Sequence, residues 1–161
     1  MIAFRKEHLP LILGTVSALL ILAVLGFQYL GGIWPCEMCQ WQRWPHFAAA
    51  AVGLGGGALL LTGAIPARTA PWIAGLAALL IAISGGIGVY HAGVEWRIFP
   101  GPAACTGPVF RLTGTLDLNA IGPRCDVAAW RLFGISLAGY NAIVSLSVAG
   151  IAAFLLSRKK S

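Results

Sequence analysis

Residues 9–35 form a segment without a single charged side chain. A helix that crosses a lipid bilayer needs about 20 consecutive apolar residues, and helices suit the bilayer because they satisfy their own backbone hydrogen bonds. Three further mainly apolar segments follow along the chain. The sequence therefore predicts an all-α integral membrane protein, a four-helix transmembrane bundle with spans at about residues 9–33, 36–62, 72–91 and 132–156.

The composition agrees with a membrane protein and argues against a soluble one. Hydrophobic residues make up 58% of the chain and charged residues only 10%, whereas soluble domains carry about 25% charged residues. The formal net charge is +6, but no basic run is interleaved with aromatic residues as in a nucleic-acid site. We expect a single domain over residues 1–161 that contacts the lipid bilayer and binds no nucleic acid, with the first apolar segment retained as a helix.

The basic residues indicate how the bundle is oriented. Four spans place both termini and the loop around Arg68 on one side, and the long loop of about residues 92–131, between helices three and four, on the other. Lys and Arg number six on the first side and five on the second, and all three lysines are on the first. The basic end Arg158-Lys159-Lys160 directly follows the last helix. By the positive-inside rule both termini are therefore predicted to be cytoplasmic.

The four cysteines all fall on the predicted extracytoplasmic side. Cys36 and Cys39 open the second helix, and Cys105 and Cys125 lie in the long loop. Disulfides form and persist in oxidising compartments outside the cytoplasm, and an even number of cysteines is compatible with two disulfides.

The Cys-x-x-Cys pair shares a helix face with two other polar groups. Pro35 favours a helix start, where the N-terminal dipole stabilises a thiolate. At about 100° per residue, Cys36, Cys39, Arg43 and His46 all lie within about 80° of one another. Ionisable groups in a membrane helix are functional candidates by default. The alternative is that Arg43 extends to the interface and the cysteines are inert.

The second cysteine pair admits two interpretations. A disulfide between Cys105 and Cys125 would close a loop of about 20 residues and restrict the unfolded chain by roughly 3 kcal/mol. The same bond would also be able to exchange with the first pair, because thiols relay electrons by successive thiol–disulfide exchange. The residues alone leave a structural and a redox role open.

A dithiol in a membrane helix needs an electron acceptor, and a lipid-soluble quinone suits the bilayer. Haem c attachment would require histidine at position 40, which is Gln40, and the distant cysteines lack the close spacing of structural zinc ligands. Arg43 is placed to stabilise a thiolate and negative charge on a quinone oxygen. His91, at the end of the third helix, is a candidate proton or hydrogen-bond donor, and His46 is a similar candidate.

Several segments together resemble one family of bacterial membrane proteins. They are residues 34–43 with the sequence WPCEMCQWQR, Tyr90-His91, the pair Cys105 and Cys125, and residues 130–140 with the sequence WRLFGISLAGY. These segments resemble the disulfide bond formation protein B (DsbB) family over nearly the whole chain. The resemblance implies a multi-pass protein of the bacterial inner membrane with a periplasmic loop, acting as a quinone-dependent protein disulfide oxidoreductase. Ubiquinone or menaquinone would be its cofactor.

The resemblance also implies roles for individual residues. The disulfides would be Cys36–Cys39 and Cys105–Cys125. Cys105 would form a mixed disulfide with a DsbA-like periplasmic thioredoxin-fold partner, after which Cys125 would exchange with Cys36. Cys39 would face the quinone with support from Arg43, and electrons would leave to the membrane quinone pool. The family usually has apolar residues inside the motif, whereas Glu37 stands here, and a carboxylate beside the thiols would oppose thiolate formation.

Other functions remain open from the residues. One is a paralogue of the same family that serves a dedicated partner, and another is a membrane protein that binds a metal through its cysteines. A quinone reductase resembling vitamin K epoxide reductase is disfavoured by the arginine spacing and the cysteine order. The glycines of helices two and three are expected to let the helices approach closely: Gly53, Gly55, Gly56, Gly57, Gly85, Gly86 and Gly88. Tyr140 and Asn141 are expected to bond across the bundle.

Overall fold

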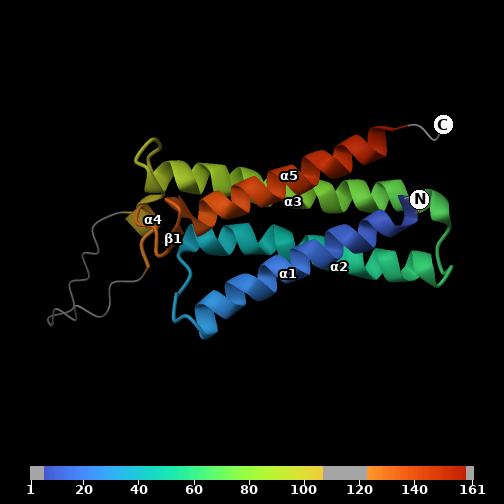
Figure 1. The fold of residues 1–161 in the computed structure, drawn as a ribbon, viewed down its shortest axis with the longest axis horizontal. Helices are drawn as coiled ribbons and strands as arrows, with labels where there is room; N and C mark the ends of the chain where they lie inside the picture. Colours follow the sequence, from blue (N-terminus) through green and yellow to red (C-terminus); the bar gives the residue numbers. More distant parts are fainter. Residues whose placement is uncertain (1–5, 107–122, 159–161) are drawn as a thin grey trace, which may run out of the picture.

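A computed structural model describes residues 6–106 and 123–158 of the chain. Four long helices dominate these residues: α1 (Leu9–Tyr29), α2 (Glu37–Leu61), α3 (Ala70–Glu95) and α5 (Leu137–Ser157). Each of the four is long and apolar enough to cross a membrane. They pack lengthwise into one bundle (Figure 1). The predicted four-helix membrane bundle is therefore confirmed.

The helix ends differ from the predicted bounds for local reasons. The first helix ends at Tyr29 rather than near residue 33, because Gly31 and Gly32 follow and Gly32 has a φ of +68°, which favours glycine. α3 continues to Glu95, one turn beyond the predicted end at His91. α2 begins where predicted: the Cys36 sulfur caps the helix by accepting the N–H of Cys39 at 3.2 Å.

The predicted start of the last helix, near residue 132, is wrong because a β-hairpin occupies this segment. Strand β1 (Arg131–Leu132) pairs antiparallel with β2 (Ile135–Ser136). Phe133 and Gly134 between them have φ values of 50° and 80°, and positive φ at both central residues defines the type I′ hairpin turn. α5 then starts at Leu137 with Ser136 as its cap. The long loop also holds one short helix, α4 (Ala103–Thr106), and residues 107–122 of this loop lie outside the described residues.

Glycines let α1 and α2 meet backbone to backbone. A methyl group on Gly53 would lie 2.6 Å from Cα of Gly14 and from the carbonyl oxygen of Pro10. The predicted packing role is confirmed at five of the seven glycines: Gly53, Gly56, Gly57, Gly85 and Gly88. At Gly55 and Gly86 a methyl group would meet nothing within 4 Å, so the prediction is wrong there.

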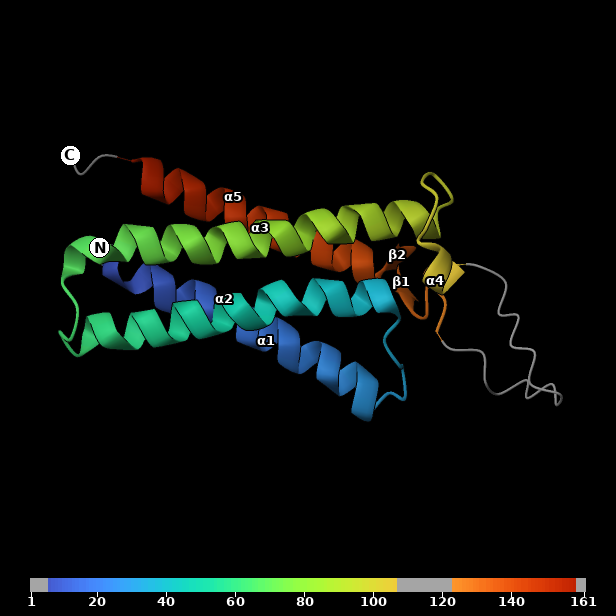
Figure 2. The same ribbon diagram turned by 180° about the vertical axis from the view of Figure 1, so that it is seen from behind.

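The two ends of the bundle differ in construction. The beginning of α1 and the end of α5 lie together at one end, whereas α4 and the β-hairpin lie at the other (Figure 1). Toward that second end α1 turns away from α2, as the view from behind shows (Figure 2). The cysteines belong to this second end, since Cys36 caps the start of α2 and Cys105 lies in α4.

Candidate functional site

Both cysteine pairs belong to one buried cluster at the hairpin end of the bundle. Cys36 and Cys125 are 5% and 0% exposed, and they pack with Met38 and Val94. Their respective neighbours Cys39 and Cys105 pack against the same cluster. The helices therefore bring together two pairs that are 66 residues or more apart in the chain.

The two pairs differ in the separation of their sulfur atoms. Cys105 and Cys125 form a disulfide with their Cα atoms 5.4 Å apart. Cys36 and Cys39 are thiols whose sulfur atoms lie 2.6 Å apart. Two sulfur atoms on one helical turn at this separation are placed for a disulfide, but the predicted Cys36–Cys39 bond stays a prediction.

His91 lies beside the thiol pair and brings a carboxyl group with it. Its Nε2 is 3.7 Å from the Cys36 sulfur and 3.7 Å from Oε1 of Glu95, one turn later on α3. The side chains of His91 and Glu95 are only 3% and 5% exposed. Oε2 of Glu95 has no hydrogen-bond partner among the residues that the structure describes. Glu37, by contrast, is exposed, so the buried carboxyl group at the thiols is Glu95 rather than the residue inside the motif.

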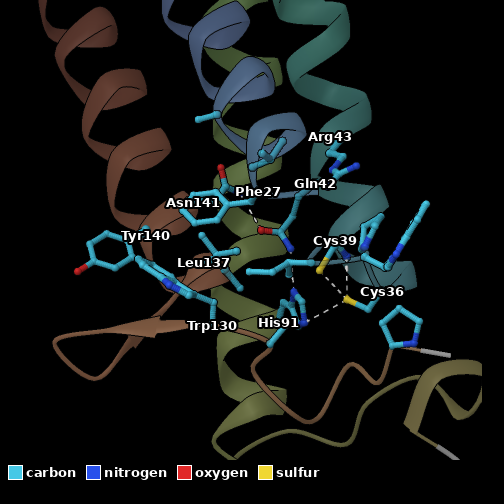
Figure 3. A pocket seen from close by; sticks show the side chains of 18 of the residues that line it. Phe27, Cys36, Cys39, Gln42, Arg43, His91, Trp130, Leu137, Tyr140 and Asn141 are labelled. Atoms are coloured by element: carbon cyan, nitrogen blue, oxygen red, sulfur yellow. Dashed lines mark hydrogen bonds between the residues drawn. The ribbon is translucent and has the colours of Figure 1, made fainter. Parts of the chain in front are cut away.

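A ladder of side-chain amides connects His91 to the middle of the bundle (Figure 3). Nε2 of Gln42, on α2, lies 2.8 Å from Nδ1 of His91. Oε1 of Gln42 accepts a hydrogen bond from Nδ2 of Asn141, on α5, at 2.9 Å. Asn141 also donates to the backbone carbonyl of Ser84, on α3, at 3.2 Å. The expectation that Asn141 bonds across the bundle is therefore confirmed, whereas the Tyr140 hydroxyl bonds to the hairpin at Leu132.

Arg43 and His46 lie on the same face of α2 as the thiols, farther along the helix, as the helical periodicity predicts. Arg43 donates from Nη1 to Oε1 of Gln28 on α1 at 2.6 Å. His46 is 3% exposed and bonds to Ser17 and Asn141 at 3.3 and 3.0 Å. His46 therefore belongs to the network between helices, and the histidine in contact with a thiol is His91.

A cavity of about 350 Å³ opens between the helices beside these groups. Its wall includes five predicted site residues: Cys36, Cys39, Arg43, His46 and His91. Three aromatic side chains form another part of the wall, with ring centroids 5.1 Å apart for Phe27 and Trp130 and 6.3 Å apart for Trp130 and Tyr140. Small-molecule sites are concave spaces of about 300–1,000 Å³, lined mainly by apolar groups with a few polar ones, and this cavity has that size and lining.

The loop disulfide is held by bonds of its own outside the bundle. The N–H of Cys125 donates to the carbonyl of Cys105 at 3.0 Å. Arg124 donates to the carbonyl of Thr106 at 3.0 Å and forms a two-pronged bond to Asp126 at 2.8 Å. This hydrogen bond to Arg124 holds the pKa of the Asp126 carboxyl below its usual value. Arg124 therefore joins the two segments that carry the disulfide.

Sequence reasoning missed three residues of this site. Gln42 and Ser84 are polar residues in apolar helices, which is a general signal for bonding between helices. Glu95 falls in the predicted loop, although its spacing of four residues from His91 places both on one face of a continued helix.

The fold and the site define a class: a multi-pass membrane protein in which a Cys-x-x-Cys pair and a loop disulfide share one cluster. The chain belongs to the disulfide bond formation protein B (DsbB) family, whose model matches residues 6–155. A curated relative, Disulfide bond formation protein B of Aromatoleum aromaticum, is 30% identical over 166 residues, which cover 98% of this chain and 96% of the relative. The comparison with solved structures gave no significant match. The protein is thus a disulfide-forming membrane protein.

Proposed function

We propose that this protein is a quinone-dependent disulfide oxidoreductase that reoxidises a DsbA-like periplasmic dithiol protein and passes the electrons to the membrane quinone pool. The observation that carries the proposal is the packing of the two cysteine pairs in one cluster, beside a cavity whose wall includes both Cys36 and Cys39. Family membership supports the same function.

The cysteines account for a complete transfer of electrons. A partner dithiol reduces the Cys105–Cys125 disulfide and becomes a disulfide itself. Cys125 then attacks an oxidised Cys36–Cys39 pair at the Cys36 sulfur, and Cys105 resolves the mixed disulfide, so that the loop disulfide is restored. Two electrons and two protons arrive at the Cys36–Cys39 pair. The burial of Cys125 and Cys36 in one cluster supports this route.

The residues around the cavity fit a quinone. Cys39, Arg43 and the aromatic side chains of the cavity wall are the residues that would hold it. Bound there, the quinone would accept the two electrons and two protons of the dithiol. Arg43 is fixed by its bond to Gln28, and a preorganised cation of this kind stabilises developing negative charge without reorganising.

The proposed orientation follows from the same chemistry. Both cysteine pairs would face the periplasm, the oxidising compartment outside the bacterial inner membrane, and both termini would lie in the cytoplasm. The beginning of α1 and the end of α5 lie together at the bundle end opposite the cysteines (Figure 1), which supports this arrangement.

The function is tested by quinone reduction. The detergent-purified protein is supplied with reduced DsbA and ubiquinone or menaquinone, and quinone absorbance is followed for the wild type and for Cys39→Ser. We expect multiple turnovers with the wild type and none with the variant, because the variant has no second sulfur with which to close the disulfide. An absence of turnover from folded, quinone-supplied wild type would contradict the proposal.

Metal binding is the second candidate, because the ligand atoms of Cys36, Cys39 and His91 all lie within 4.8 Å of one another. Two thiolates and an imidazole are ligands that Zn²⁺ accepts. This function predicts one tightly bound Zn²⁺ per reduced chain and activity that needs no quinone. A paralogue with a dedicated partner would instead reduce quinone with its own dithiol partner but not with DsbA.

A further inference from the structure

The hydrogen bonds of Asn141, Gln42 and His91 allow only one orientation of each side chain. A backbone carbonyl can only accept hydrogen bonds, so the Asn141 atom 3.2 Å from the Ser84 carbonyl must be the amide nitrogen. The opposite atom, Oδ1, then accepts from the hydroxyl of Ser145 at 2.9 Å. This assignment rests on the bonds themselves, which is the basis for distinguishing amide oxygen from nitrogen.

The orientation of Gln42 follows from two separate bonds. Its Oε1 must accept, since it faces the amide nitrogen of Asn141 at 2.9 Å. Its Nε2 must donate, since it faces the backbone carbonyl of Met38 at 3.1 Å. Each of the two bonds alone gives the same orientation of the Gln42 amide.

Gln42 in turn determines where His91 carries its proton. Nε2 of Gln42 lies 2.8 Å from Nδ1 of His91, and an amide nitrogen offers no lone pair. Nδ1 must therefore accept this bond, which places the proton of a neutral imidazole on Nε2. That nitrogen is the one that lies 3.7 Å from both the Cys36 sulfur and Oε1 of Glu95.

We propose that Gln42, oriented by Asn141, is a positioning residue that keeps the His91 proton on Nε2, where the N–H is shared between the Cys36 sulfur and the Glu95 carboxyl group and stabilises the negative charge of the reduced cysteine pair. The proposal deepens the proposed oxidoreductase function and rests on it. It makes His91 a neutral hydrogen-bond donor to sulfur rather than a base or a metal ligand.

The sharing of one N–H gives the site a response to its own redox state. When Cys36 is part of a disulfide, its sulfur is a weak acceptor, and the N–H turns to Glu95. When the pair is reduced and ionised, its negative charge is shared across the 2.6 Å contact of the two sulfur atoms, and the Cys36 sulfur is the stronger acceptor. Stabilising the reduced, ionised pair makes the disulfide a stronger oxidant, which favours electron transfer from the loop cysteines.

Other charged and polar groups near this N–H belong to several elements. Arg43 acts on Cys39 electrostatically from the same helix, α2, and His46 lies farther along that helix. Arg131 of β1 and Ser136 of β2 both act on the Glu95 carboxyl group. The backbone of Cys125 also lies against His91. Variants at these positions are therefore avoided in the test, apart from Glu95 itself.

The imidazole nitrogens report the proton directly. The full-length protein, labelled with ¹⁵N-histidine, reduced and free of quinone, is examined by NMR in detergent near pH 7. We expect His91 of the wild type to show a protonated Nε2 and an unprotonated Nδ1. Gln42→Glu replaces the donor by an acceptor of the same shape, so we expect a proton to appear on Nδ1.

Ser145→Ala is the matched control, because it removes a hydrogen bond from Oδ1 of Asn141 and leaves the Nδ2 side intact. Its His91 spectrum should match that of the wild type. A wild-type His91 with its proton on Nδ1, or one fully protonated, would overturn the proposal. So would a Gln42→Glu spectrum identical to that of the wild type.

Alkylation by iodoacetamide gives a second readout, the thiolate content of the pair as a function of pH. A hydrogen bond to a charged group shifts an ionisation by on the order of tenfold. We expect Gln42→Leu to lower the thiolate fraction of the Cys36–Cys39 pair about tenfold at a given pH, and Glu95→Gln to raise it. Shifts of the same sign in both variants would contradict the shared N–H. Quinone reduction by the wild type tests the function separately, so either result can fail alone.

Discussion

The two cysteine pairs of this protein are held in opposite ways. Cys36 caps a 25-residue helix and Cys39 lies in its first turn, next to His91 of another helix. Cys105 lies on a helix of four residues and Cys125 in an irregular segment, joined by one backbone bond and the Arg124 bonds. Groups that must meet a small molecule precisely are best placed on rigid elements, whereas binding segments for partners are usually loops. The difference supports the proposal that the helical pair serves the cavity and the loop pair serves a partner protein.

The largest expected effect comes from separating the two pairs. In the double variant Cys105→Ser with Cys125→Ser, we expect turnover with reduced DsbA to fall by three or more orders of magnitude, since a missing nucleophile removes the covalent route. Dithiothreitol, which is small enough to reach Cys36 directly, should still support quinone reduction by the same variant. Both rates are read from quinone absorbance.

Equal losses with both donors would show that the loop pair supports the fold of the site rather than transferring electrons. The control is Cys39→Ser, in which we expect both donors to fail. Retained turnover of the double variant with DsbA would contradict the assignment of the loop pair.

Substitutions in the cavity wall are expected to have a smaller effect, and only on the reaction of the helical pair with quinone. Arg43→Leu removes the cation that faces the cavity, and loss of one preorganised donor typically slows a reaction about a hundredfold. Gln28→Leu is the matched variant, because it removes the partner of Arg43 at 2.6 Å but leaves the cation. We expect a loss of about tenfold or less there, with exchange between the protein dithiol and Cys105–Cys125 unchanged in both variants.

The comparison of the pairs also marks what the sequence was able to predict. The four spans follow from runs of apolar residues, and the alignment of Cys36, Cys39 and Arg43 follows from helical periodicity alone. These are local properties. The meeting of both pairs at one end was predictable from the topology, because an even number of spans separates Cys36 from Cys105.

The remaining features depend on packing between helices. Gln42 and Asn141 are 99 residues apart, and their contact depends on the depth at which α2 and α5 pack. Glu95 was missed because nothing in the apolar pattern extends α3 beyond His91 into a segment with two charged residues, Glu95 and Arg97. The hairpin was missed because two-residue strands show no alternation, and Phe133 is an unusual residue for a positive φ.

The smallest expected effect concerns the ion pair that holds the loop disulfide. The hydrogen bond from Arg124 lowers the pKa of Asp126. The bond therefore stabilises the folded loop fully above the ordinary pKa of an aspartate, and this stabilisation is lost as the pH falls through the lowered pKa. Reduction of Cys105–Cys125 by a water-soluble phosphine, which works in acid, measures how accessible the disulfide is. We expect Arg124→Leu to be reduced a few-fold faster than the wild type at about pH 5, because exposed ion pairs are weak.

The same experiment in acid separates the ion pair from the other bonds of the loop. As the pH falls through the lowered pKa of Asp126, its carboxyl is protonated, and the wild-type rate should approach that of Arg124→Leu. The remaining difference is the bond to the Thr106 carbonyl, which does not titrate. A ratio of rates that stays constant over this range would mean that Arg124 acts through Thr106 alone. The loop disulfide would then depend on backbone bonds, and Asp126 would have no part in holding it.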